Sequence, residues 1–347
     1  MCASLGVTAV GVTGGIAYVQ AERALEETSL RALTLGRNEK RDRLQDLLQS
    51  HFRALAFATE DLSRHARSTG LTAIGAEVSG DLARLAVNHG YSDALLAECA
   101  GPSILSLLRP GSSPSRSAAL RAAIDAVCAG EASPRIADFE LVDRGAAELA
   151  LAYAVAAIPG EEGPVGALAF ELPMAPINAI MTSAQHWSEA GFGSSGEAYL
   201  VGADLLMRSD SRFVLERPDG DAGELRAAGL DEATIAAILR ERSTILRLPV
   251  DTEAARAAQA GISGTEILRD YRGVEVLSSY TPLEIPGVRW AILSEIDADE
   301  ALTPARTLGK HLFLVATALA ALLALLGAFL AARVARPLGR LARLAER

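Results

Sequence analysis

The densest cluster of polar side chains in a predicted strand lies in the second half of the chain. It is the alternating segment Arg208, Ser209, Asp210, Ser211 and Arg212. Guanidinium groups bind anionic groups through parallel hydrogen bonds. Arg208 or Arg212 is therefore a candidate contact for an anionic ligand at the mouth of a pocket, or for a neighbouring helix. The alternative is a solvated strand end held by local salt bridges.

Three tyrosines of the same half of the chain are candidates to line this pocket together with Asp210. They are Tyr199, Tyr271 and Tyr280, and a buried tyrosine needs a hydrogen-bond partner for its hydroxyl group. Packing in the core is the alternative for each of them. The residues therefore predict a pocket for a small molecule, and they do not identify that molecule.

The spacing of the other reactive residues does not favour an enzyme. The five histidines are scattered without metal-ligand spacing, and the chain has no nucleophile elbow, Walker loop or paired-cysteine site. Residues 191–196 match the letters G-x-G-x-x-G, but they follow a predicted helix and open a strand. A dinucleotide-binding loop does the reverse. We therefore expect no catalysis, no cofactor and no metal in these residues.

An uncharged segment near the C-terminus determines how these elements are placed. Residues 312–332 are 21 consecutive residues without a charge. At about 1.5 Å per residue they can cross the ~30 Å hydrocarbon core of a bilayer. Five arginines and a single glutamate follow, which places residues 333–347 in the cytoplasm. A buried helix of a soluble protein is the alternative.

Residues 1–21 form a second apolar segment, with no charge before Glu22. A signal peptide and a first transmembrane helix are both compatible with it. No cleavage site followed by a turn is visible, and the segment passes directly into helix-forming sequence after Glu22. These features favour a transmembrane helix. Two spans in a bacterial inner membrane then place residues 22–310 outside the cytoplasm.

The composition fits an exposed, soluble region between the two spans. The formal net charge is −10 although the C-terminal end is basic, which argues against nucleic acid as a partner. Cys99 and Cys128 fall in this outer region, where a disulfide is permitted. Free buried thiols are the alternative, and the cysteine spacing matches no metal motif.

Residues 22–68 are predicted to form one long helix. Apolar residues recur in steps of three and four, with Arg37 and Lys40 interrupting the stripe. The stripe either packs on the helix's own domain or forms a dimer stalk that continues the membrane helix outward. The two interpretations are compatible, and we expect a homodimer.

A repeat organises the rest of the outer region. Tyr153 precedes an Ile-Pro-Gly turn by five residues, and Tyr280 precedes a second Ile-Pro-Gly turn by the same five. Each turn is followed by a strand that ends in an acidic residue, Glu171 or Glu295. The chain therefore carries two copies of one module, at about residues 90–172 and 196–296.

Each copy is expected to be an antiparallel sheet with helices over one face. The Pro-Gly connections are short and typical of hairpins. Helices are predicted at residues 116–129, 174–187, 231–242, 252–260 and 299–311. The fold class is α+β: a long N-terminal helix and two tandem PAS-like modules, at residues 76–190 and 191–300, flanked by two transmembrane helices.

Several motifs resemble double Cache sensor domains of bacterial transmembrane receptors. Residues 193–212 (GSSGEAYLVGADLLMRSDSR), 270–280 (DYRGVEVLSSY) and 290–297 (WAILSEID) resemble the membrane-proximal module of that family. Residues 335–344 (ARPLGRLARL) resemble the opening of a HAMP helix. The resemblance implies a ligand-binding domain outside the membrane, a HAMP domain inside, and then an effector.

The first module departs from the family pattern. Members that bind amino acids carry an aromatic-Arg-aromatic cluster in the distal module, and residues 76–110 contain none. Amino-acid binding by that route is therefore not expected. The candidate ligand contacts in this module are Tyr91 and Asp93 in the opening strand, Asp138 in a later strand, and Tyr153.

Together these features predict the extracytoplasmic, ligand-sensing part of a homodimeric receptor that signals through its second membrane helix into HAMP. Ligand binding would shift the population between two arrangements of strand and helix. The alternative, from a different class, is the input half of a membrane enzyme, a nucleotide cyclase or histidine kinase, whose catalytic domain is missing from this chain.

Overall fold

The computed structural model describes residues 2–69, 79–101, 103–109, 117–143, 148–187, 192–216 and 222–345. Two compact units can be distinguished. The α+β unit is Ala32–Asp297, and the helical unit combines Met1–Arg31 with Ala298–Arg347. Residues 76, 190 and 191, at which we placed the module boundaries, lie outside the described residues.

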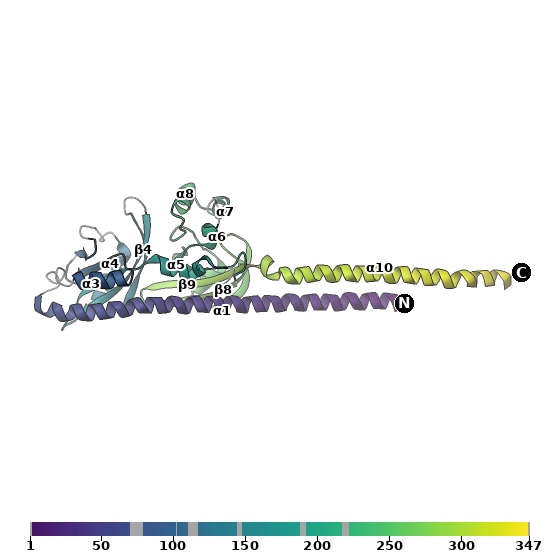
Figure 1. The fold of residues 1–347 in the computed structure, drawn as a ribbon, viewed down its shortest axis with the longest axis horizontal. Helices are drawn as coiled ribbons and strands as arrows, with labels where there is room; N and C mark the ends of the chain where they lie inside the picture. Colours follow the sequence, from purple (N-terminus) through teal and green to yellow (C-terminus); the bar gives the residue numbers. More distant parts are fainter. Residues whose placement is uncertain are drawn as a thin grey trace. The chain divides into compact units, whose positions relative to one another are not determined.

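Helix α1 runs without interruption from Cys2 to Thr69, as predicted for residues 22–68. In the α+β unit its apolar stripe is buried, including Leu33, Leu44, Leu48 and Leu55. The stripe belongs to a core cluster that also contains residues from both sheets, and α1 follows both sheets in Figure 1. Packing of the helix on its own domain is therefore confirmed, while a dimer stalk stays a prediction.

The two charged residues that interrupt the stripe are also buried. Arg37 donates to the carbonyl of Tyr280 at 2.8 Å. The Lys40 ammonium donates to the carbonyls of Ile180 and Met181 at 2.7 and 2.8 Å. Because these carbonyls accept hydrogen bonds from both side chains, the helix keeps its contact with the sheets at the positions where the apolar pattern breaks.

The first module is a five-stranded antiparallel sheet with the order β2-β1-β5-β4-β3. Helix α4 packs on one face, and α1 with α3 packs on the other. Its elements are α3 (Ser79–Asn88), β1 (Ala94–Glu98), β2 (Ile104–Ser106), α4 (Ala118–Cys128), β3 (Arg135–Asp143), β4 (Glu148–Pro159) and β5 (Pro164–Glu171).

The second module is a four-stranded antiparallel sheet with the order β6-β9-β8-β7. Helix α9 packs on the face that is opposite α1. Its elements are β6 (Glu197–Val201), α6 (Arg212–Glu216), α7 (Ala222–Ala227), α8 (Glu232–Glu241), α9 (Glu253–Gln259), β7 (Gly264–Arg269), β8 (Glu275–Ile285) and β9 (Val288–Asp297). Helix α5 (Met174–Met181) and the short helix η2 (Ser183–Gln185) connect the modules.

The repeat predicted from the sequence is confirmed by the sheet order. Strands β1, β5, β4 and β3 follow one another in the first sheet as β6, β9, β8 and β7 do in the second. Tyr153 lies on β4 and Tyr280 on β8, while Glu171 ends β5 and Glu295 lies near the end of β9. The register differs, because Glu171 is opposite Tyr153 whereas Glu295 is opposite Ser278.

The central strands read as nearly continuous apolar runs because both of their faces are covered. Six consecutive residues of β9, from Trp290 to Glu295, are buried. Alternate residues belong to the cluster with α1 and to the cluster on the opposite face. A charged residue within such a run is therefore buried as well, and Glu295 is 3% exposed.

The hairpin between β8 and β9 touches the first module through its turn. The carbonyl of Pro286 accepts from the backbone N–H of Ile136 at 2.8 Å. Gly287 has a φ of +93°, and a Cβ atom there would lie 2.2 Å from the carbonyl oxygen of Ile136. Only glycine fits this turn, because any side chain would push the two modules apart.

Helix boundaries agree with the prediction wherever a side chain caps the helix. Asp231 accepts from two backbone N–H groups at the start of α8, and Thr252 accepts from one at the start of α9. The helix predicted for residues 174–187 is too long, since α5 ends at Met181. Ser183, Ala184 and Gln185 have positive φ, which ends an α-helix.

In the helical unit, α10 extends from Ala298 to Ala345. Its segment Ala298–Phe329 is long and apolar enough to cross a membrane, and the most apolar part of it is not buried. Among the described residues this is the single segment that meets the criterion, and it includes most of the predicted span at 312–332. The predicted span at residues 1–21 and the HAMP helix at 333–347 stay predictions.

Candidate functional site

A cluster of buried polar side chains lies on the face of the second sheet that is opposite α1. Glu197 and Tyr199 come from β6, Glu295 from β9, and Ser278 from β8. They share this face because side chains two residues apart on a strand point the same way. The next residues on the same face of these strands, such as Val201 and Leu293, belong to the apolar cluster under α9. The polar groups therefore occupy one end of an apolar face.

Glu197 and Glu295 are direct register partners on adjacent antiparallel strands. They are 2% and 3% exposed. Opposite residues on paired strands have Cβ atoms about 4.5–5.5 Å apart, and like charges at such positions are destabilising. The sheet therefore places two carboxyl groups in its interior at positions that favour neutral or opposite partners.

Glu197 accepts hydrogen bonds on both of its oxygens. The hydroxyl of Tyr271 donates to Oε1 at 2.6 Å, and the backbone N–H of Arg212 donates to Oε2 at 3.1 Å. The hydroxyl of Ser211 lies 3.4 Å from Oε2. Burial raises the pKa of Glu197 to about 7, and these hydrogen bonds oppose part of that rise.

Among the described residues, the partners of Glu295 are two hydroxyl groups. Tyr199 donates to its Oε2 at 2.7 Å, and Ser278 donates to its Oε1 at 2.8 Å. Burial raises the pKa of Glu295 to about 7, with the hydroxyl groups lowering it and nearby Asp270 and Glu197 raising it further. Both tyrosines stay neutral donors, because burial raises the pKa of Tyr199 and of Tyr271 well above 10.

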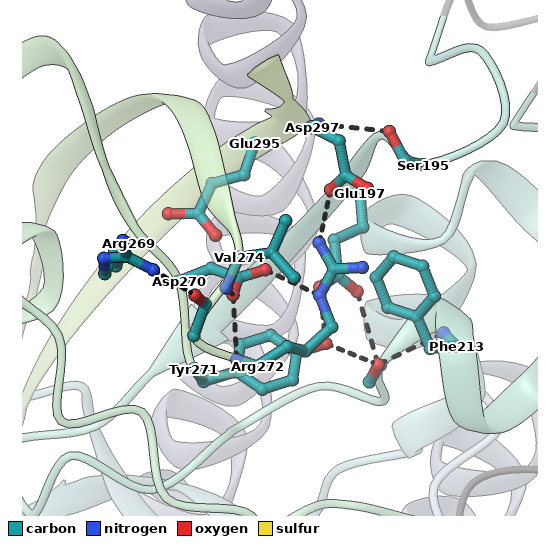
Figure 2. A network of polar contacts seen from close by, with 12 residues as sticks. Ser195, Glu197, Phe213, Arg269, Asp270, Tyr271, Arg272, Val274, Glu295 and Asp297 are labelled. Atoms are coloured by element: carbon teal, nitrogen blue, oxygen red, sulfur yellow. Dashed lines mark hydrogen bonds and ion pairs between the residues drawn. The ribbon is translucent and has the colours of Figure 1, made fainter. Parts of the chain in front are cut away.

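Arg272 lies beside this pair and is occupied by two other carboxylates. It donates to Asp270 at 2.6 Å and to Asp297 at 2.5 Å, and its guanidinium carbon lies 3.9 Å from the ring centroid of Phe213. Figure 2 shows the side chains of Arg272, Asp270 and Asp297 converging above Tyr271. The loop between β7 and β8 is thereby fastened to the last residue of β9.

The loop that carries Arg272 is ordered by Asp270. The carboxylate of Asp270 accepts from the backbone N–H groups of Arg272 and Val274 at 2.8 and 3.0 Å, an arrangement typical of aspartate in turns. Gly273 completes the turn with a φ of +76°. Asp270 is 5% exposed, and burial raises its pKa.

A small cavity adjoins the cluster. It is lined by Ser211, Tyr271 and Arg272 on one side, and by Phe213, Val214, Leu225, Ala228 and Leu248 on the other. Its volume is about 20 Å³, enough for about one water molecule. In this conformation the second module holds a closed polar cluster beside a very small apolar chamber.

The corresponding face of the first module is different. Helix α4 covers it with apolar side chains, and the cluster contains Ala97, Ala123, Ala137, Ala167 and Ala169. A disulfide between Cys99 and Cys128 joins the chain after β1 to the last residue of α4, with Cα atoms 5.5 Å apart. The pairing that the sequence left open is therefore present.

That face also carries buried polar groups. Glu171 is 3% exposed and lies opposite Tyr153 in the sheet register. The guanidinium of Arg109 is 3.8 Å from the Glu171 carboxylate. Of the residues predicted as ligand contacts in this module, Tyr153 belongs to the cluster under α4.

Tyr91 and Asp93 occupy other positions. Tyr91 belongs to the cluster on the α1 side, where its ring stacks on Phe170 at 4.4 Å and its hydroxyl lies 2.8 Å from Nδ1 of His51. Asp93 accepts from the hydroxyl of Ser106 at 2.7 Å and organises the β1–β2 connection. The described contacts of both residues are structural.

Asp138 and Arg208 pair with each other across the two modules. The guanidinium of Arg208 donates to both carboxylate oxygens of Asp138 at 3.0 Å. The indole N–H of Trp290 donates to the same carboxylate at 2.8 Å, and the Trp290 ring stacks on Phe139. The sequence proposed these two residues separately as ligand contacts, and the structure brings them together at the junction between the modules.

The remaining predicted residues brace the second module. Asp210 accepts from the Asn178 side chain at 2.7 Å and from the Ser243 hydroxyl at 2.8 Å. Arg212 donates to the carbonyls of Gly196 and Gly193 at 2.6 and 3.0 Å. The expectation of a solvated strand end is wrong, because residues 208–212 are buried and lie outside the strands. A ligand role for either residue stays a prediction.

Of the four predicted tyrosines other than Tyr91, three lie around the polar cluster or next to it. Tyr199 and Tyr271 contact the glutamate pair directly, with their rings edge to face at 5.7 Å. Tyr280 lies in the neighbouring apolar cluster and donates to Glu266 at 2.6 Å. The structure therefore brings together part of the predicted pocket.

Four charged residues of the cluster were missed in the sequence analysis. Glu197, Glu295, Asp270 and Arg272 were not among the candidate contacts, although all four are in motifs that we singled out. The available signal was a glutamate next to an apolar run of a strand, which begins β6 and lies near the end of β9. The pairing of the two glutamates depends on the sheet register, and one sequence alone does not give that register.

Two solved structures share this fold over most of the chain. The ligand-binding domain of the Pseudomonas fluorescens chemoreceptor CtaA, in complex with L-isoleucine, has 13% identity and a TM-score of 0.51, with 81% of this chain and 97% of that chain covered. The ligand-binding domain of the Campylobacter jejuni chemoreceptor Tlp3, in complex with L-valine, has 10% identity and a TM-score of 0.50, with 82% and 98% covered.

These likenesses establish the fold. The long helix and two antiparallel sheets have the Cache-like arrangement found in ligand-binding domains of bacterial chemoreceptors. No family model and no curated protein matches the chain. The resemblance inferred from three short motifs is therefore supported at the level of the fold.

Proposed function

We propose that this chain is the extracytoplasmic ligand-sensing part of a bacterial transmembrane receptor. The α+β unit binds a small molecule, and α10 carries the response across the membrane. The single observation that supports this most strongly is the fold, since the chain covers nearly the whole ligand-binding domain of two bacterial chemoreceptors. Fold alone does not determine function, so two further features are needed.

The first supporting feature is the connection to a helix that can cross a membrane. Strand β9 ends at Asp297 and α10 begins at Ala298, with its apolar segment reaching Phe329. A central strand of the sheet therefore continues directly into the candidate span. A change in the end of β9 needs no linker to reach it.

The second supporting feature is the difference between the two faces of each sheet. The α1 side is a continuous apolar core through both modules. The opposite sides differ between the modules and carry the buried polar groups. A ligand that binds on an opposite side can shift a population only by its differential affinity for two states.

The finer parts of the proposal concern topology and assembly. We propose two spans, with residues 22–310 outside the inner membrane, a cytoplasmic C-terminus that opens a HAMP domain, and a homodimer in the membrane. The ligand is a small molecule of unassigned class. The amino acids bound by the two structural neighbours are the first compounds to test.

Ligand binding can be measured on the full chain in lipid nanodiscs. Thermal unfolding is recorded with a panel of amino acids, small carboxylates and amines. A ligand that binds only the folded state stabilises it by about 2.7 kcal/mol at 100 times its Kd, so a saturable rise in Tm is expected for at least one compound class. No rise across the panel, with correct topology, would contradict sensing of these classes.

Topology needs a separate measurement. In a Cys2→Ser background, Glu284→Cys and Arg333→Cys introduce single labelling sites at two exposed positions. A membrane-impermeant maleimide should label position 284 in intact spheroplasts, and position 333 only after permeabilisation. The reverse pattern would place the α+β unit in the cytoplasm and end the proposal.

A further inference from the structure

The buried polar cluster of the second module contains more acid than base. Among the described residues, four carboxyl groups gather around one guanidinium group: Glu197, Glu295, Asp270 and Asp297 around Arg272. The first three are 2%, 3% and 5% exposed. Figure 2 shows all five side chains in one view. One positive charge does not balance four negative ones in a buried site.

The other nearby cations are engaged elsewhere. Arg212 contributes its backbone N–H to Glu197, while its guanidinium contacts Glu216 at 3.1 Å and two backbone carbonyls. Arg269 is exposed and donates to the carbonyl of Gly273. Arg272 itself is bound to Asp270 and Asp297. Within the described residues, neither glutamate therefore makes a salt bridge.

The remaining groups that face the glutamates are neutral hydroxyls. Tyr271 and Ser211 face Glu197, and Tyr199 and Ser278 face Glu295. A hydroxyl can either donate or accept. The same four groups can therefore solvate a carboxylate, or accept the hydrogen of a protonated carboxyl group, without a change in the backbone.

We propose that Glu197 and Glu295 form a proton-binding site, and that the second module responds to pH independently of any small-molecule ligand. The proton is the ligand. On binding, it forms an O–H bond with a carboxylate oxygen and removes one negative charge; on release, it passes to water and the charge returns. The inference goes beyond the proposed function, because it requires no organic ligand.

The direction of the response follows from burial. The pKa of each glutamate is raised from the ordinary value of 4.5 to about 7 in the folded state. Between these values the unfolded chain releases protons that the folded chain keeps. The contribution of these two glutamates to folding stability is therefore greatest at or below pH 4.5, falls as the pH rises toward about 7, and is lost above that value.

The position of Glu295 connects the proton to the end of β9. Glu295 is two residues before Asp297, where Arg272 holds the strand end. When both glutamates ionise, two like charges face each other across the β6–β9 pairing. We expect this pairing to open more often, so that backbone amides of β6 and β9 exchange faster with solvent.

The test uses the full chain in lipid nanodiscs, with protons as the only probe. Infrared difference spectra are recorded about one pH unit below and above the pKa of about 7. The C=O band of protonated carboxyl groups should be present on the acid side and fall about tenfold on the alkaline side. The Glu197→Gln/Glu295→Gln variant should lose this difference.

Controls separate the proposal from a general acid effect. Glu284→Gln, at an exposed position of β8, should keep the wild-type band difference. If the double variant fails to fold, the wild-type protein and the single variants still test the proposal. Each single variant should lose about half of the band difference between the two pH values. A wild-type protein without a protonated carboxyl band on the acid side would overturn the proposal.

Hydrogen exchange completes the test. Backbone amide exchange accelerates everywhere as the pH rises, and α4 serves as the reference for this general effect. Exchange in β6 and β9 should accelerate more than exchange in α4 between the two pH values. This extra acceleration should vanish in Glu295→Gln. Equal behaviour of the two modules would also overturn the proposal. Neither outcome depends on the compound panel, so failure of this inference and failure of ligand sensing can be distinguished.

Discussion

The sheets of the two modules are covered in the same way on one face and differently on the other. Both sheets pack apolar side chains against α1, which runs along the two sheets and contributes to one common core cluster. On the opposite side, the first module has α4, small apolar residues and a disulfide. The second has short helices, a buried glutamate pair and four hydroxyl groups.

This difference follows from the geometry of strands. Alternate side chains of one strand belong to opposite faces, so one face can be kept for stability while the other changes. In β9, Trp290 and Ile292 belong to the α1 cluster, whereas Ala291 and Leu293 belong to the cluster under α9. A buried charge can therefore be accommodated on one face while the packing of the other is kept.

The largest effect is expected at the junction between the modules, where a substitution tests whether the two modules depend on each other. Arg208→Ala removes a guanidinium that is 4% exposed and leaves the Asp138 carboxylate with Trp290 as its side-chain donor. Removal of one partner from a fully buried pair costs about 3–5 kcal/mol, and the Asp138 side chain is 28% exposed, so the cost lies at the lower end of this range. We expect a loss of about this size in the free energy of unfolding, measured by denaturant titration.

A matched control is available on the surface. Arg256 and Asp251 form a pair in which both side chains are about 60% exposed, and Arg256→Ala should cost under about 1 kcal/mol. If Arg208→Ala costs no more than Arg256→Ala, the modules are not held together by this pair. Separate unfolding transitions for the two modules in Arg208→Ala would show that the junction makes them one cooperative unit.

The sequence was sufficient to predict the repeat, because its evidence is local. The Ile-Pro-Gly turns, the strand after each turn and the capped helices α8 and α9 all depend on neighbouring residues, and all are present. The long helix was also predictable, since α1 has an apolar stripe that needs no knowledge of its partner.

The candidate site was harder to predict, because its residues meet through the sheet. Asp138 and Arg208 are 70 residues apart in the chain, and no local pattern relates them. Tyr91 was proposed as a ligand contact, and its side chain belongs to the cluster on the α1 side. Strand alternation specifies two faces but not which is which, so the sequence did not give this placement. Glu197 and Glu295 were overlooked because a single acid in an apolar strand is normally exposed.

The disulfide tests whether the first module depends on a different kind of stabilisation. It closes a loop with a sequence separation of 29, and a disulfide of this loop length contributes about 2–4 kcal/mol. Replacement of Cys99 and Cys128 by serine should lower stability by this amount. Hydrogen exchange should show the loss in α4 first, with α9 unaffected.

Cys2→Ser is the control, because it removes a cysteine without touching the disulfide. Reduction of the wild-type protein should reproduce the effect of the double replacement, while the double variant itself should not respond to reductant. An equal increase of exchange in α4 and α9 would mean that the opposite faces of the two modules are not independent.

The smallest expected effect concerns Tyr91 and decides to which face this residue belongs. Its hydroxyl lies 2.8 Å from Nδ1 of His51, and burial lowers the pKa of His51 to about 4, so the imidazole is neutral at pH 7. Tyr91→Phe keeps the ring on Phe170 but leaves a buried nitrogen without this partner. Such a group costs about 1–3 kcal/mol.

The double variant Tyr91→Phe/His51→Leu should recover most of that loss, because removing both polar partners from an apolar site is nearly neutral. The same variants address the earlier assignment of Tyr91 to the ligand. A residue that only packs against α1 changes stability without changing the midpoint of any ligand response measured in nanodiscs. Loss of the ligand response in Tyr91→Phe, with stability unchanged, would instead place a binding site on the α1 side of the first module, and the contrast between a constant face and a variable face would no longer hold.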